Sequence, residues 1–159
     1  MKYQELVDVY SALENTTKRL EKTQIISNFL LKLDSTTLEQ VGLLILGSIF
    51  PAWSDKEIGI GNKLVMQAVG EAVGVTPDKV EDAVRDQGDI GLACISLYAK
   101  KSQTTFFSQP LTIDFVFKSL RKLSEKSGAR STKRKIDIIL EMLSQASASE
   151  AKYLTRTIL

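Results

Sequence analysis

The residues best suited to chemistry lie in one stretch near the carboxyl end of the chain, SGARSTKRKIDIILEML, Ser127–Leu143. After Gly128, the hydroxyl residues Ser131 and Thr132 are suited to capping a helix, and three cations, Lys133–Lys135, would then occupy its first turn. Cations oppose the dipole at a helix N-terminus, so helix stability does not explain them. Hydroxyls, backbone N–H groups and cations at a helix start together suit a phosphate group, and we interpret this stretch as a phosphate-binding site.

The helix that follows must be anchored for such a site to hold its shape. Apolar residues recur at the spacing i, i+3, i+4 and i+7, which predicts a single buried face made of Ile136, Ile139, Leu140 and Leu143.

Composition limits the possible functions. The 159 residues are 43% hydrophobic and 25% charged, which fits one soluble domain spanning residues 1–159. There is no histidine, which excludes the Ser-His-Asp triad and removes the usual metal ligand. The single cysteine, Cys94, excludes an internal disulfide and indicates a small core residue. We expect no metal site, no membrane span and no secretory signal.

Positive charge is concentrated in one part of the chain. Ten of the 21 Lys and Arg residues fall within residues 100–135, beside only two acidic residues. A nucleic-acid footprint and a solvated surface both explain such a segment, and charge alone leaves the choice open.

Helical periodicity dominates the whole sequence, and no alternating segment predicts a strand. We therefore predict an all-α fold, a single compact domain of about nine helices. A third helix is expected to be buried on most sides and to run from Asp34 or Ser35 to about Ile49, where Pro51 stops it. The other helices are expected around Leu6–Leu13, Ile26–Leu33, Val65–Gly74, Pro77–Gln87, Asp89–Lys100, Thr112–Leu123, Ser131–Leu143 and Ser149–Ile158. The apolar ending YLTRTIL predicts a fragment of a longer protein.

Two further glycine pairs precede predicted helices. Gly59 and Gly61 come before one helix, and Gly88 and Gly91 surround the start of another. Glycine turns let backbone N–H groups approach a phosphate, although each could equally be a tight corner between helices. The repetition of this device at Gly128 favours contact with a nucleic-acid backbone, which would be independent of sequence and sensitive to salt.

Two other charged segments are weaker signals. Lys18 and Arg19 belong to a small basic cluster that a solvated surface explains as well. Lys135–Ile138 approaches the Lys-x-Asp-Gly motif of nucleotidyl transferases, but its fourth residue is isoleucine and it lies within a predicted helix. We reject it as a nucleophile and expect no catalytic residue in this chain.

A loop between two predicted helices carries a glutamine and two aromatic residues, Gln103, Phe106 and Phe107. Adjacent exposed aromatic rings normally need a partner to cover them. Peptides that dock on sliding clamps have this pattern, whereas rings folded into the domain's own core would explain it equally.

These motifs together resemble the N-terminal DNA-binding domain of the ATP-dependent DNA ligases of archaea and of the eukaryotic replicative type. The resemblance covers essentially the whole chain. Its matching segments are Leu46–Pro51 with Ile58–Leu64, Arg85–Ala93, Phe106–Ile113, Ser127–Leu143 and Glu150–Leu159.

The resemblance implies an all-α domain that grips the minor-groove side of nicked double-stranded DNA. Family members form an enzyme–AMP adduct, transfer AMP to the 5′-phosphate and then join the 3′-hydroxyl, in replication and repair. ATP and Mg²⁺ are implied for the full-length parent and no cofactor for this chain. Because no Lys-x-Asp-Gly motif is present, the chain alone should be inactive. The resemblance also implies an intracellular, nucleoid-associated monomer.

The resemblance also assigns residues. The expected DNA contacts are Gly128, Ala129, Arg130, Ser131, Thr132, Lys133, Lys135, Gly59, Gly61, Gly88 and Gly91, with Lys18, Arg19 and Arg156 as weaker candidates. It favours docking of Gln103, Phe106 and Phe107 on a PCNA-type sliding clamp. Thr104 and Thr105 stand where some relatives have a lysine, so clamp affinity is expected to differ.

Two other functions compete with this interpretation. A helical protein–protein interaction module whose basic face meets an acidic partner would have no affinity for duplex DNA. A free-standing enzyme is disfavoured, since the sequence has neither histidine nor a nucleotide-binding motif.

Overall fold

The computed structural model describes residues 1–99, 109–125 and 131–159. Within these ranges the chain forms nine α-helices and no named strand, which confirms the predicted all-α fold. The helices are α1 (Tyr3–Glu14), α2 (Arg19–Leu30), α3 (Ser35–Ile45), α4 (Asn62–Val73), α5 (Pro77–Gln87), α6 (Ile90–Ala99), α7 (Ile113–Ser124), α8 (Ser131–Gln145) and α9 (Ala148–Ile158).

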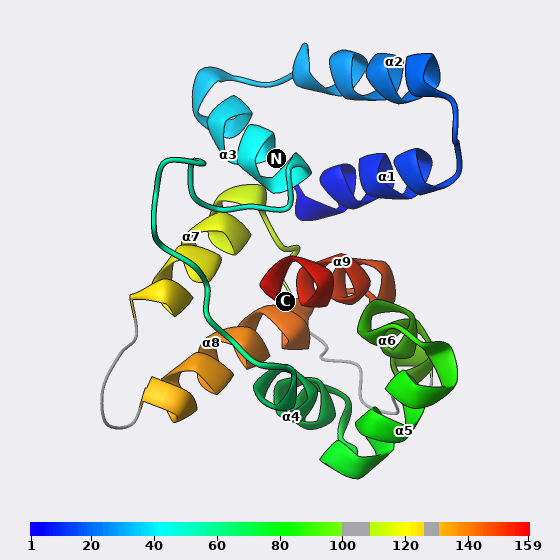
Figure 1. Ribbon diagram of the computed structural model, residues 1–159, viewed down its shortest axis with the longest axis vertical. Coiled ribbons are helices and arrows are strands. Elements are labelled where there is room, and N and C mark those ends of the chain that lie inside the picture. The colour runs from blue at the N-terminus through cyan, green and yellow to red at the C-terminus, as the bar shows by residue number, and fades with distance from the viewer. Residues whose placement is uncertain (100–108, 126–130) are drawn as a thin grey trace.

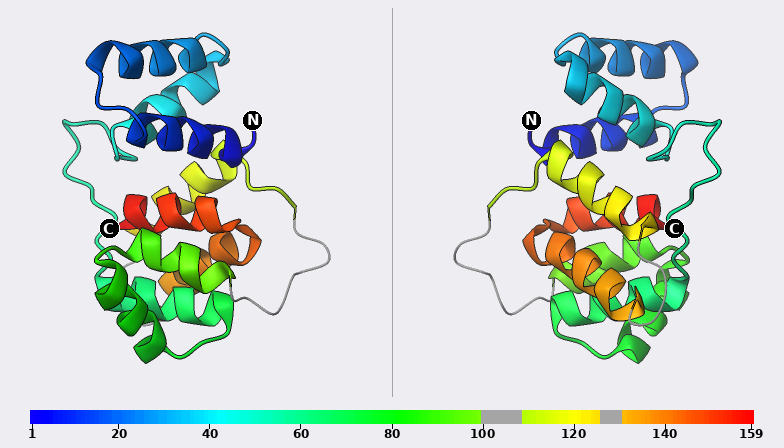
Figure 2. Two further views of the ribbon diagram at one scale, coloured as in Figure 1. Left: turned by 90° about the vertical axis from the view of Figure 1, so that its right-hand side faces the viewer. Right: turned by 90° about the vertical axis from the view of Figure 1, so that its left-hand side faces the viewer.

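The helices are arranged around α9, which lies in the middle of the molecule (Figure 1). The helices α1, α2 and α3 form one end and α4, α5 and α6 the other, while α7 and α8 run between them (Figure 2). Helix α9 packs along α6 and α1, and α8 packs along α4. The N-terminus is held by an antiparallel bridge between Lys2 and Thr112.

Helix ends lie where local chemistry predicts them. Side chains of Asp34, Thr112 and Ser147 accept hydrogen bonds from backbone N–H groups in the first turns of α3, α7 and α9. Helices α4 and α5 end at Gly74 and Gly88, both in the left-handed conformation that favours glycine. The predicted ends of α4 and α5 are therefore confirmed, whereas α4 begins at Asn62, before the predicted Val65.

The predicted end of α3 is wrong. The helix stops at Ile45, well before Pro51, because Gly47 adopts a φ of +70° and reverses the chain. The N–H groups of Gly47 and Ser48 then donate to the carbonyls of Leu44 and Leu43, a Schellman ending. Nor is this segment buried on most sides, since Leu46 is 79% exposed.

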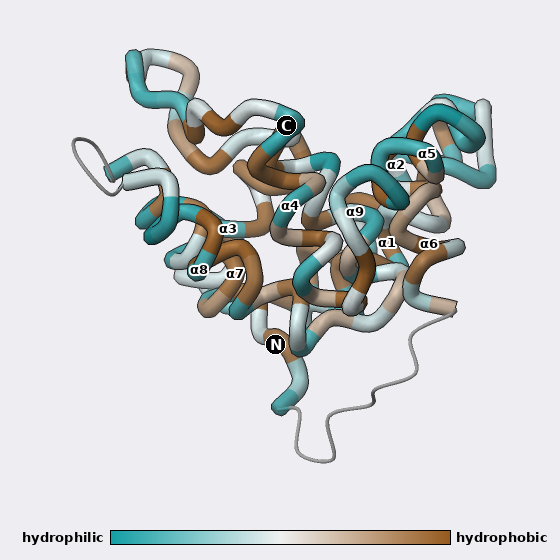
Figure 3. The backbone as a smooth tube through the Cα atoms, turned by 90° about the horizontal axis from the view of Figure 1, so that it is seen from below, coloured by the Kyte–Doolittle hydropathy of each residue, from teal (hydrophilic) through white to brown (hydrophobic). Residues whose placement is uncertain are grey.

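The buried residues form one contiguous core. Cys94 lies in it, which confirms the predicted small core residue, and burial raises the pKa of its thiol to about 11. The buried face of α8 differs by one position from the prediction, since Met142 is fully buried while Leu140 is only half-buried. In Figure 3 apolar segments gather in the interior and hydrophilic stretches of α5 and of the start of α8 lie at the periphery.

Candidate nucleic-acid interface

The predicted phosphate site is at the start of α8. Thr132, Lys133 and Arg134 are exposed, and no acidic residue is present in the first turn. Ser131 and Thr132 are the first two residues of the helix, and among the described residues no N-terminal cap by either side chain is observed. The three cations therefore share the first turn of a helix whose opposite side is buried through Ile136 and Ile139.

The loop 51–61 is attached to this helix. Lys135 is half-buried, and its Nζ donates a hydrogen bond to the carbonyl oxygen of Gly59 at 3.3 Å. Gly59 has a φ of +61°, a conformation that favours glycine, and Gly61 directly precedes α4. Figure 1 shows the loop passing over α8 before it enters α4. Lys135 and Gly59 are 76 residues apart and belong to two different predicted DNA-binding segments, and the structure brings these segments into contact.

The segment leading into this loop is fixed by a second cation. The Nε of Arg121 donates to the carbonyl oxygen of Ile49 at 3.1 Å. Its guanidinium lies 4.6 Å from the ring centre of Phe117 and 5.6 Å from that of Phe50, within the range of cation–π attraction. The loop is thus tied to α7 near its beginning and to α8 near its end.

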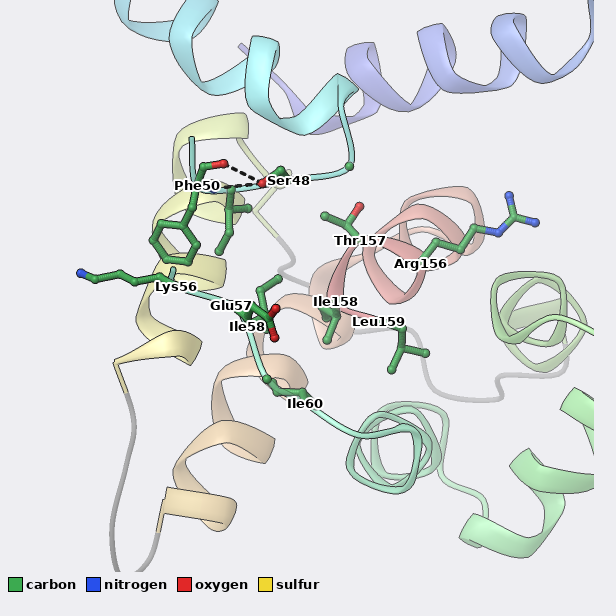
Figure 4. A pocket seen from close by; sticks show the side chains of 13 residues that line it. Ser48, Phe50, Lys56, Glu57, Ile58, Ile60, Arg156, Thr157, Ile158 and Leu159 are labelled. Atoms are coloured by element: carbon green, nitrogen blue, oxygen red, sulfur yellow. Dashed lines mark hydrogen bonds between the residues drawn. The ribbon is translucent and has the colours of Figure 1, made fainter. Parts of the chain in front are cut away.

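A hollow lies between this loop and the end of α9. It is lined by residues 47–50, 56–60 and 156–159. In Figure 4 the apolar side chains of Ile58, Ile158 and Leu159 lie around its centre, while Lys56 and Arg156 point away from it in opposite directions. The hollow is therefore mixed in character, because the carboxylate of Glu57 lies beside Ile58 near its centre (Figure 4).

Another glycine turn lies between α5 and α6. Gly88 has a φ of +72°, and its N–H donates to the carbonyl of Val84 at 2.8 Å. Asp89 follows and caps α6, since its Oδ1 accepts a hydrogen bond from the Leu92 N–H at 2.8 Å. The helix start that the sequence predicts at Asp89 is therefore confirmed.

Arg156 is bound to two carboxylates. Its Nε and one terminal nitrogen donate to Asp89 Oδ1 at 3.1 and 2.9 Å, and the other terminal nitrogen donates to Glu14. Glu14 also accepts a hydrogen bond from Lys152 at 2.6 Å. The sequence predicts Arg156 as a weak DNA contact. Its partners Glu14 and Asp89 are 142 and 67 residues away, so the residues flanking Arg156 do not indicate these ion pairs.

Gly91 also has a structural role. It is buried in the first turn of α6, and a Cβ there would lie 2.8 Å from the backbone oxygen of Lys152. Its missing side chain lets α9 approach α6, which explains the glycine without any contact with DNA.

Most of the predicted elements face the same side of the molecule. The turn 15–18 before α2, loop 51–61, the start of α6, the start of α8 and the C-terminus all lie on the side that faces the viewer in Figure 1 (Figures 1 and 2). We call this side the turn face. Lys18 and Arg19 at the edge of it are exposed, and Lys18 is paired with Glu21 at 2.7 Å.

Comparison with known proteins identifies the family. A family model described as "DNA ligase N terminus" matches residues 2–159. The chain belongs to this family. It is similar to the DNA ligases of Methanothermobacter thermautotrophicus, 52% identical over 157 residues and 99% of the chain, and of Thermococcus onnurineus, 43% identical over 159 residues and all of it. The DNA ligase of Methanocaldococcus jannaschii is 34% identical over 163 residues.

The match confirms the resemblance found in the sequence. This DNA ligase N-terminal chain spans 28% of the length of each of those three relatives. Two groups of predicted site residues lie outside the described residues: Gly128, Ala129 and Arg130, and Gln103, Phe106 and Phe107. In the described ranges, no cluster of three or more Asp, Glu, Cys or His residues could hold a metal ion, and no helix is long and apolar enough to cross a membrane.

The ion pairs around Arg156 predict how stability depends on pH. Burial acts to raise the pKa of Asp89, but hydrogen bonds from Arg156 and from the Leu92 backbone outweigh it, and the pKa is lowered from 3.8. The pKa of Glu14 is likewise lowered from 4.5, because hydrogen bonds from Lys152 and Arg156 outweigh its burial. A carboxylate with a lowered pKa stabilises the fold above its unfolded-state pKa, and this is lost as the pH falls through the folded value.

We therefore expect the free energy of unfolding, measured by urea titration, to fall between about pH 5 and about pH 3 more steeply for the wild type than for Glu14→Gln/Asp89→Asn. Parallel pH profiles for the two proteins would contradict this account of the ion pairs.

Proposed function

We propose that this chain is the DNA-binding part of an ATP-dependent DNA ligase, and that its turn face holds nicked double-stranded DNA while the nick is sealed. The observation that carries the proposal is the contact between Lys135 and Gly59, which joins the cationic start of α8 to a glycine turn. Family membership supports the same conclusion, since the relatives are DNA ligases.

The contacts are expected to go to the DNA backbone. Lys133 and Lys135 supply positive charge, and Ser131 and Thr132 supply hydroxyl donors in the same helical turn. The turns at Gly59, Gly61 and Gly88 allow backbone N–H groups to approach phosphates and sugars on the minor-groove side. We also propose Gly128, Ala129 and Arg130 as DNA contacts, and only the sequence supports these three. Contacts of this kind carry little sequence information and weaken with salt.

The ligation chemistry is assigned to the whole enzyme. We propose that the full-length protein uses ATP and Mg²⁺, and that the groups binding them lie outside this chain. The sequence has no Lys-x-Asp-Gly motif, so the chain alone is expected to bind nicked DNA without sealing it. We further propose that the protein acts inside the cell, at the nucleoid, and as a monomer.

The test is the binding of the wild-type chain to a nicked duplex across a series of salt concentrations. We expect binding at low salt and a linear fall of log affinity against log salt concentration. Absence of duplex binding at low salt would favour the alternative function, a helical module whose cations meet an acidic protein partner.

We also propose that residues 103–107 dock on a PCNA-type sliding clamp, with Phe106 and Phe107 in an apolar pocket and Gln103 in a polar one. The glutamine followed by two aromatic residues supports this proposal, together with the resemblance described under the sequence analysis. Phe106→Ala/Phe107→Ala is expected to weaken clamp binding at least about 100-fold, since buried aromatic anchors dominate such interfaces.

The measurement is a calorimetric titration of an archaeal sliding clamp into the wild type and into the double variant, which gives the two clamp affinities. The affinity of each protein for a nicked duplex is the control. Unchanged clamp affinity of the double variant would refute the docking proposal, and unchanged duplex affinity would show that the variant is folded.

A further inference from the structure

Asp89 makes two kinds of contact at the corner between α5 and α6. Its Oδ1 caps α6 through the Leu92 N–H, and both of its carboxylate oxygens accept hydrogen bonds from Arg156 Nε, at 3.1 and 3.3 Å. The residue before it is Gly88, whose left-handed conformation turns the chain. The same carboxylate therefore fixes the first turn of α6 and ties the Gly88 turn to α9.

The packing leaves little freedom for this contact. At Gly91 an added Cβ would lie 2.8 Å from Arg156 Nε and 3.0 Å from Asp89 Oδ1, so the ion pair occupies the space that a side chain would fill. The Arg156 side chain is 31% exposed, and its guanidinium lies 5.8 Å from the ring centre of Tyr153. Three elements, α1, the α5–α6 corner and α9, thus meet at one side chain.

Charge around Arg156 is balanced. The cations Arg156 and Lys152 contact the carboxylates of Glu14 and Asp89. Two positive and two negative charges offer no net attraction to a phosphate. Arg156 is therefore unlike Lys133, which is exposed beside two other cations.

We propose that the Arg156–Asp89 ion pair is a positioning element of the DNA-binding surface. It holds the Gly88 turn and the first turn of α6 in place on the turn face, and Arg156 does not itself contact phosphate. This inference rests on the proposed function. It adds Asp89, an acidic residue, to the groups on which duplex affinity depends.

The test compares Asp89→Asn and Arg156→Gln with the wild type on a nicked duplex across a salt series, at a temperature where all variants are folded. Asp89→Asn keeps an oxygen that can cap α6 but loses the ion pair. It also removes a negative charge from the turn face, so electrostatics alone would tighten DNA binding. The control is Ile113→Val, a buried substitution at the start of α7 on the opposite side of the molecule.

We expect Asp89→Asn and Arg156→Gln each to weaken duplex binding about tenfold, because binding must then order the Gly88 turn and the first turn of α6, which the ion pair otherwise holds in place. The slope of log affinity against log salt should stay within ~0.5 of the wild-type value, and Ile113→Val should bind as the wild type does.

Three results would overturn the inference: tighter binding by Asp89→Asn, a slope reduced by about one unit in Arg156→Gln as for a lost phosphate contact, or unchanged affinity of both variants. Absence of wild-type binding would instead refute the proposed function itself, so the two failures are distinguishable.

Discussion

Replacing Lys133 and Lys135 together by alanine is expected to reduce the slope of log duplex affinity against log salt concentration by about two units. Each phosphate contact by a cation releases condensed counterions, so the slope counts such contacts. Near physiological salt we expect an affinity loss of about 100-fold or more, since phosphate contacts supply most of sequence-independent binding. Fluorescence anisotropy of a labelled nicked duplex measures both quantities.

The matched control removes the same charge elsewhere. Lys32 and Lys118 are exposed, and they lie in the turn after α2 and in α7 rather than in the elements of the turn face. Lys32→Ala/Lys118→Ala should change the slope by less than ~0.5 unit. Equal slope changes in the two double variants would contradict a localised site at the start of α8 and would indicate a response to net charge alone.

Substituting Gly91 by alanine is expected to destabilise the fold by about 2–3 kcal/mol, because the new methyl group would overpack a closed interface. The added Cβ would lie 2.8 Å from the Lys152 carbonyl oxygen, which is backbone and cannot rotate away. It would also lie 2.8 Å from Arg156 Nε and so would displace the guanidinium from Asp89. Urea denaturation followed by circular dichroism measures the loss.

Gly42→Ala provides the comparison for this prediction. Gly42 lies within α3, and no atom would come within 4 Å of an added Cβ. Alanine is favoured over glycine inside a helix, so this change is expected to stabilise the fold by about 0.5–1 kcal/mol. A Gly91→Ala protein as stable as the wild type would show that α6 and α9 can separate without cost, contrary to the packing described above.

The parts of the structure that the sequence predicted well depend on local interactions. The helix ends near Gly74 and Gly88, the helix start at Asp89 and the range of α7 each depend on residues within a few positions of one another. The end of α3 differs from the prediction because Pro51 is not its stop signal: Gly47 already reverses the chain through its left-handed conformation.

The contacts that organise the candidate site are long-range, and this is why they were not predicted. Lys135 and Gly59 were both assigned to DNA, but nothing in their flanking residues indicates that they contact each other. The sequence predicts Arg156 as a weak DNA contact, because the two carboxylates that hold it are distant in sequence. Only the packing of α9 against α1 and α6 brings these charges together.

The most direct test of the central claim is to map the DNA contact surface by amide chemical shifts in nitrogen-15-labelled protein during titration with a nicked duplex. The proposal predicts the largest shifts at residues 59–61, 88–90 and 131–135, on the turn face. The chemical shifts of amides at the start of α7 and in the turn after α2, on the opposite side, should not change. Shifts concentrated on that opposite side, with residues 59–61 and 131–135 unchanged, would contradict it.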